Sequence, residues 1–135
     1  MSEEPHVVVM DSDRSEQQSD SAAARTLAAD FVRRHCPWAD LEAVLLVVSE
    51  LVTNAVRHTA GWWRLQMWAH QGELVIELDD TSHELPVART PDFAGGGGFG
   101  WHMVQRLAAR VEVLAMGTGK RIKATWLAPM AAVPA

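Results

Sequence analysis

The sequence has a single cysteine, no tyrosine and no long run of apolar or like-charged residues. One thiol, Cys36, excludes an internal disulfide and a metal cluster built on several cysteines. No apolar stretch reaches the ~18 residues that cross a membrane, and the polar opening SEEPH is unlike a signal peptide. We therefore expect a cytoplasmic protein that does not bind a membrane.

Basic residues are also scarce, with 12 Lys and Arg against 17 Asp and Glu and a net charge of −5. They form no block that could follow a phosphate backbone, so direct binding to nucleic acid is not expected. The length of 135 residues and the apolar content of 48% suit one globular domain with a single core.

Hydrophobic periodicity predicts strands and helices in an order that excludes a regular alternation of the two. A helical layer on one face of an antiparallel or mixed sheet, an α+β sandwich, fits this order. The expected elements are a strand at 6–10, a helix at 22–35, a helix from an N-cap at Asp40 to about Thr59, strands at 62–70 and 74–80, a helix at 99–110, and strands at 111–116 and 121–127.

The chain carries no internal repeat and no linker between domains. We expect a strand and a polar lead-in over 1–21, one folded domain over 22–127, and a disordered tail over 128–135. The stretch 81–98 is too long for a routine connection, which indicates either a functional loop or disorder.

A polar row on the second expected helix is the first candidate site. Glu50, Asn54, Arg57 and His58 fall within roughly 100° of arc, opposite a face of valine, leucine and alanine. A carboxylate, a carboxamide and an imidazole along one edge could hold a metal ion and polarise a hydroxyl group. A solvent-exposed helix edge of ordinary composition is the alternative.

Asp80 is the second candidate, because alternation in 74–80 places it on the same face as Leu74, Ile76 and Leu78. A carboxylate at the end of a core-facing row needs a donor. That donor could be the exocyclic amine of adenine, or the backbone of Thr81 and Ser82 in a turn.

Glycines at 95–98 and at Gly100 lead into the third expected helix. Glycines before a helix N-terminus expose backbone N–H groups to an anion. Neither this run nor Gly119-Lys120 has the spacing of a Walker A or dinucleotide-binding motif. A flexible linker is the alternative.

Together these motifs resemble the GHKL superfamily of gyrase, Hsp90, histidine kinases and MutL. The similarity is greatest to stand-alone bacterial anti-sigma factor serine-protein kinases, and it covers 22–127. SELVTNAVRHT (49–59) matches the N box, LVIELDDTSHELP (74–86) the adenine segment, GGGGFGWHMVQRLA (95–108) the end of the ATP lid, and GTGKRIKATW (117–126) the closing turn.

The resemblance implies a two-layer sandwich of the Bergerat type, with helices packed on one face of a mixed sheet. It implies ATP and Mg²⁺ as ligands, Glu50 as general base, Asn54 as the metal ligand and Asp80 as the adenine acceptor. The ATP-binding residues it implies are Asn54, His58, Asp80, Gly96, Gly97, Gly98 and Gly100. The implied reaction is phosphorylation of a serine on an anti-sigma factor antagonist, by a protein that also sequesters a sigma factor.

The sequence departs from the family pattern at several points. Ser82 replaces a glycine of the adenine segment, Arg121 replaces a common threonine, and the residues behind the lid are bulky. Two alternatives to a kinase therefore stay open: a non-catalytic module that binds a partner in an ATP-dependent way, and an interaction protein with a degenerate pocket. Trp62 and Trp68 share one face of their strand, which suggests a protein interface, such as that of a homodimer. Helices that cover this face are the alternative explanation.

Overall fold

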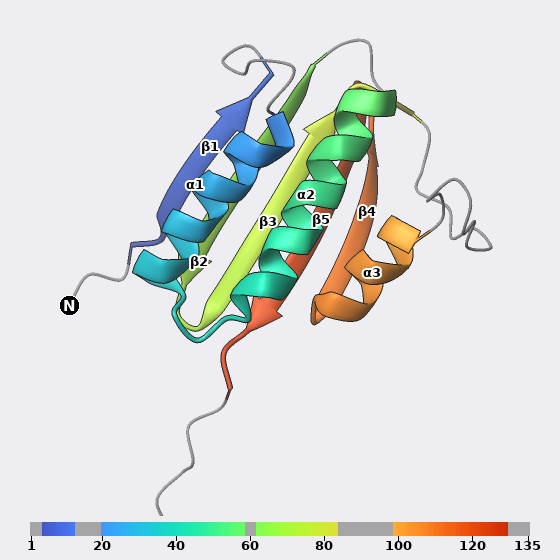
Figure 1. The fold of residues 1–135 in the computed structure, drawn as a ribbon. Coiled ribbons are helices and arrows are strands. Elements are labelled where there is room, and N and C mark those ends of the chain that lie inside the picture. Colours follow the sequence, from blue (N-terminus) through green and yellow to red (C-terminus); the bar gives the residue numbers. More distant parts are fainter. Residues whose placement is uncertain (1–3, 13–19, 59–61, 84–98, 130–135) are drawn as a thin grey trace, which may run out of the picture.

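The computed structural model describes residues 4–12, 20–58, 62–83 and 99–129 (Figure 1). Every expected helix and strand is present within these ranges. In chain order they are β1 (His6–Asp11), α1 (Asp20–His35), α2 (Leu41–His58), β2 (Trp63–His70), β3 (Glu73–Asp80), α3 (Phe99–Leu107), β4 (Arg110–Met116) and β5 (Gly119–Leu127). Among the described residues, no helix combines the length and apolarity needed to cross a bilayer.

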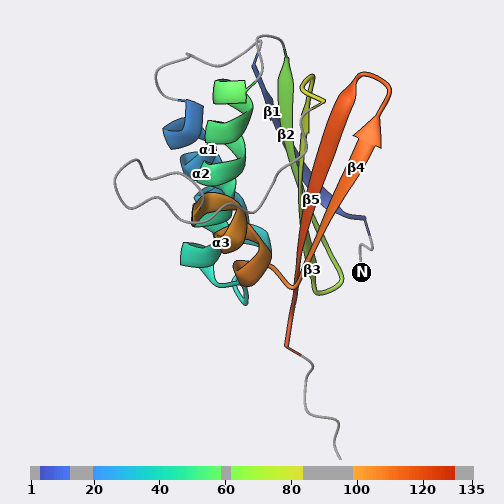
Figure 2. The ribbon, with the colours of Figure 1, turned by 90° about the vertical axis from the view of Figure 1, so that its right-hand side faces the viewer.

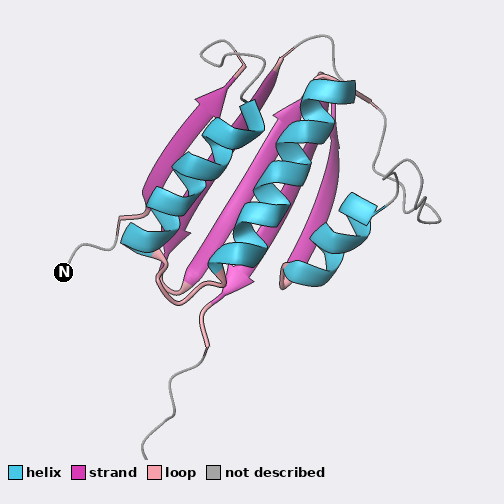
Figure 3. Cartoon of the chain, viewed as in Figure 1, coloured by secondary structure: helices cyan, strands magenta, loops and turns pink. Residues whose placement is uncertain are grey.

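The strands form one sheet in the order β1-β2-β3-β5-β4, and the helices lie together on one of its faces (Figures 2 and 3). This confirms the two-layer α+β sandwich. Each described pairing is antiparallel, which is one of the two sheet types that the element order left open, whereas the resemblance implied a mixed sheet. The reason is that β5 inserts between β3 and β4, which run in the same direction and would otherwise be parallel neighbours.

The core lies between α2 and the middle of the sheet. The apolar face of α2 is buried, as the helical repeat predicts, and it packs with the inward residues of β2 and β3. Burial of this apolar surface is the main favourable term holding the layers together. The side chains concerned are Val44, Val48, Leu51, Val52 and Ala55 from α2, Trp63, Leu65 and Met67 from β2, and Leu74, Ile76 and Leu78 from β3.

Individual hydrogen bonds explain where α2 begins and where α3 ends. Asp40 caps α2 as predicted, because its Oδ1 accepts the N–H of Ala43 at 3.2 Å. The third helix ends at Leu107 rather than at residue 110. The Ala109 N–H already donates to the Thr125 carbonyl at 2.8 Å, so the backbone has joined the sheet by that residue.

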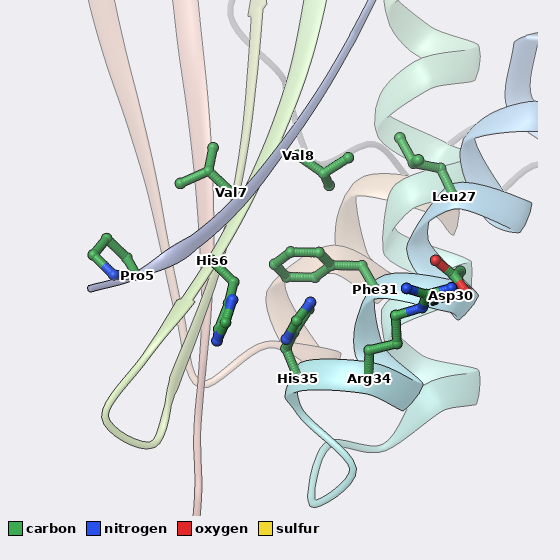
Figure 4. A pocket seen from close by; sticks show the side chains of 9 residues that line it. All are labelled: Pro5, His6, Val7, Val8, Leu27, Asp30, Phe31, Arg34 and His35. Carbon is green, nitrogen blue, oxygen red and sulfur yellow. Dashed lines mark hydrogen bonds and ion pairs between the residues drawn. The ribbon is translucent and has the colours of Figure 1, made fainter. Parts of the chain in front are cut away.

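At the β1 edge, the rings of His6 and His35 stack with their centroids 3.9 Å apart and their planes at 17° (Figure 4). Phe31 is 5.0 Å from His35, centroid to centroid. These rings line a pocket of about 370 Å³ between β1 and α1. Burial lowers the pKa of His35 below its ordinary 6.5, His6 and Arg34 lower it further, and Asp30 opposes them.

This lowered pKa predicts a pH-dependent contribution to stability. The unfolded chain protonates His35 first as the pH falls below 6.5, so the free energy of unfolding decreases from that pH down to the pKa in the folded protein. His35→Phe keeps a ring against Phe31 and removes the titration. The free energy of unfolding, measured by urea denaturation between pH ~5 and ~8, is expected to change less with pH in the variant. An equal pH dependence in the two proteins would contradict the assignment of this effect to His35.

Candidate functional site

The polar row of α2 lies along one edge of the helix, at the margin of the core. Glu50 and Asn54 are half-buried, and Arg57 is exposed. His58 is the last residue of α2. The C-terminal ends of α2 and β3 lie at the same end of the sandwich, so the row and Asp80 belong to one end of the molecule (Figure 1).

Glu50 lies directly against Gly100 in the first turn of α3. A β-carbon at Gly100 would overlap the Glu50 carboxyl group, so only glycine fits there without a shift. The first N–H groups of a helix have no intrahelical partner, and they carry the positive end of its dipole. The structure therefore brings a carboxylate, predicted from one motif, to an anion-attracting helix end, predicted from another.

Asp80 ends β3 on the helix side of the sheet, as strand alternation predicts, and it is buried. Its carboxylate forms an ion pair with Lys120 at the start of β5. The Lys120 Nζ is 3.0 Å from Oδ1 and 3.1 Å from Oδ2. The two side chains are only 4% and 7% exposed, so this is a buried pair.

Asp80 also closes a local turn. Its Oδ1 accepts the N–H of Ser82 at 3.0 Å, and the Ser82 carbonyl lies 3.5 Å from the Lys120 Nζ. Asp80 therefore caps a turn, as one interpretation of the sequence predicted. It also pairs with Lys120, which the motif did not indicate.

A second ion pair joins Asp79, which precedes Asp80 on β3, to Arg121, which follows Lys120 on β5. It lies on the open face of the sheet, the face away from the helices. Arg121 binds Asp79 through two hydrogen bonds of 2.7 and 2.9 Å. Its Nε is also 3.3 Å from a Glu77 carboxylate oxygen. The hydrogen bond to Asp79 raises the pKa of Arg121, against the effect of burial. The pairing of β3 with β5 therefore places an acidic residue opposite a basic one on each face of the sheet.

Comparison with known proteins identifies the domain. Residues 14–126 match the family described as histidine kinase-like ATPase domain. The chain belongs to this family. No curated protein matched the sequence.

The fold resembles that in the crystal structure of the RsbU and RsbW domains of Rv1364c from Mycobacterium tuberculosis. The TM-score is 0.60 at 15% identity, over 93% of this chain and 32% of that one. The chain thus spans about a third of the length of that relative. At this identity, the similarity is evidence for the fold.

The described part of the ATPase domain contains some of the predicted site residues. Glu50, Asn54, Asp80 and Gly100 lie within it, whereas Gly96, Gly97 and Gly98 lie outside the described residues. Over the described ranges, no group of three or more His, Cys, Asp or Glu side chains is placed to hold a metal ion.

Lys120 is the site residue that the motifs did not reveal. Alternation along 121–127 contains the signal, because Ile122, Ala124 and Trp126 face the helices and Lys120 has the same parity. Its partner could not be found in this way, because Asp80 is 40 residues away and the pairing depends on strand register.

Gly119 is required where β5 begins beside Asp80, and this requirement is testable. It has φ of +151°, and a β-carbon there would overlap the Asp80 carbonyl oxygen and lie 2.8 Å from the Thr81 Cα. Gly119→Ala is expected to lower the free energy of unfolding by about 1–3 kcal/mol. The measurement is chemical denaturation followed by tryptophan fluorescence.

Gly117→Ala is the matched control, because Gly117 is in the same turn and a β-carbon there would meet nothing within 4 Å. We expect a change within about 0.5 kcal/mol for this variant. Equal stabilities of the two alanine variants would show that the close approach of Gly119 to Asp80 does not constrain the fold.

Proposed function

We propose that this ATPase domain binds Mg·ATP and phosphorylates a serine of an anti-sigma factor antagonist, and that it also sequesters a sigma factor. The observation that carries the proposal is the contact between the Glu50 carboxylate and Gly100 at the start of α3. A carboxylate beside an anion-attracting helix end suits a reaction in which a hydroxyl group attacks a phosphoryl group.

Asp80 would hold the adenine. Its carboxylate is buried at the end of a core strand, where an amine donor has little competition from water. Only part of its acceptor capacity is left for adenine, because the Lys120 ammonium group and the Ser82 N–H already donate to the Asp80 carboxylate.

Asn54 would hold Mg²⁺ through its side-chain carbonyl oxygen, one helical turn after Glu50. When bound, Mg·ATP supplies the γ-phosphoryl group, and the metal neutralises part of its charge. The backbone N–H groups near Gly100 would orient the phosphates.

Glu50 would accept the proton of the attacking serine hydroxyl. The half-buried position of Glu50 leaves one side open to a substrate. Asn54 and the first turn of α3 then act by orientation, which is most of what phosphoryl transfer needs.

The proposed partners are a sigma factor and its anti-sigma factor antagonist. They are supported by the resemblance of the motifs and by the similar fold of the structure that contains an RsbW domain. A homodimer and a cytoplasmic location also stay predictions.

A phosphoryl-transfer assay separates the roles of Glu50 and Asn54. With Mg·ATP and a cognate antagonist, Glu50→Ala is expected to reduce phosphoserine formation by about 10²–10⁴-fold and to retain ATP binding. Asn54→Ala is expected to weaken Mg·ATP binding itself. Phosphoserine is measured by mass spectrometry and binding by calorimetry.

Glu42→Ala is the matched control, because Glu42 is an exposed carboxylate in the first turn of the same helix. It is expected to behave like the unmodified protein. Equal phosphoserine formation by the unmodified protein and Glu50→Ala would rule out Glu50 as the base.

The Asp80–Lys120 pair favours one alternative function, a module that binds its partner without transferring phosphate. An acceptor that is already neutralised would bind ATP weakly. ATP-dependent partner affinity without phosphoserine would select this alternative. A complete absence of ATP binding would instead indicate an interaction protein with a degenerate pocket.

A further inference from the structure

We propose that Lys120 is an internal competitor for the nucleobase: its ammonium group occupies the carboxylate of Asp80 and so sets the affinity for adenine nucleotides. This inference rests on the proposed function, in which Asp80 is the adenine acceptor.

The hydrogen bonds of Asp80 define the competition. A carboxylate has about four acceptor positions. Oδ1 accepts from Lys120 and from the Ser82 N–H, and Oδ2 accepts from Lys120. An incoming amine must therefore use the remaining position on Oδ2 or displace the ammonium group. In the first case it meets a carboxylate whose charge is already balanced, and in the second it must break the ion pair.

The pair is built into the sheet. Asp80 and Lys120 are directly opposite each other in the antiparallel pairing of β3 with β5, and both face the helices. A β-carbon at Gly119, immediately before Lys120, would overlap the Asp80 carbonyl oxygen, so the two strand ends lie close together. The ammonium group is thus positioned at the acceptor by strand register.

A displaced ammonium group has another acceptor nearby. The Ser82 carbonyl is 3.5 Å from Nζ, at the edge of hydrogen-bonding distance. A small movement of the lysine head would strengthen this contact as it releases Asp80. Exchange of one donor for another at Asp80 is therefore possible without unfolding the strand ends.

Lys120→Met tests the competition, because methionine is of similar length and donates no hydrogen bond. Removing a charged hydrogen bond should tighten binding of Mg·ATP by about tenfold or more. Adenosine should gain by a similar factor, because the competition is at the base. Both dissociation constants are measured by isothermal titration calorimetry on the full chain.

Arg121→Met is the matched control. Like Lys120→Met, it removes one positive charge, but at the next residue, whose ion pair with Asp79 lies on the open face of the sheet. Its dissociation constants are expected to stay within about twofold of those of the unmodified protein. An equal gain in this variant would attribute the effect to net charge and overturn the proposal.

Three other results distinguish the possible failures. Unchanged or weaker binding by folded Lys120→Met overturns the competition and leaves the proposed function intact. A gain for ATP without a gain for adenosine also overturns it, because Lys120 would then act on the phosphates. Binding of ATP by none of the proteins refutes the proposed function, and the competition with it.

The variant leaves a buried carboxylate without its counter-ion, which can prevent folding. Lys120→Gln removes the charge and keeps a side-chain hydrogen-bond donor, so it provides a second test. A smaller gain in adenosine affinity is expected for this variant. The absence of any gain in a folded Lys120→Gln protein overturns the proposal.

Discussion

The register between β3 and β5 is the constraint on which the site depends. It places Asp80 opposite Lys120 on the helix side and Asp79 opposite Arg121 on the open side. Side chains alternate between faces, so a slip of one residue would move each carboxylate to the other face of the sheet. A larger residue at the start of β5 would overlap the Asp80 carbonyl unless the backbone shifted, and this restricts how the two strand ends can meet.

The helical layer adds the second half of the site. The apolar face of α2 is buried against the sheet, so its polar edge must point along the margin of the core. There Glu50 meets Gly100, and the start of α3 is held beside the carboxylate. Packing of one helix thereby positions a candidate base.

The sequence alone was sufficient for the elements, for the burial of Asp80 and for the opposite orientation of Asp79, because these follow from local periodicity. The strand order was not accessible, so an antiparallel sheet could not be separated from a mixed one until β5 was placed between β3 and β4. The contacts of Glu50 with Gly100 and of Asp80 with Lys120 were inaccessible for the same reason. They join segments far apart in the chain, and only packing and register bring them together.

The central claim is that α2, the end of β3 and the start of α3 surround one nucleotide. Hydrogen exchange followed by mass spectrometry, with and without Mg·ATP, tests this directly. The account predicts slower exchange in peptides that contain Glu50 to Asn54, Asp80 to Ser82 and Gly100 to Met103, because a ligand there would shield these backbones. Unchanged exchange in all three segments, or protection confined to β1 and α1, would contradict it.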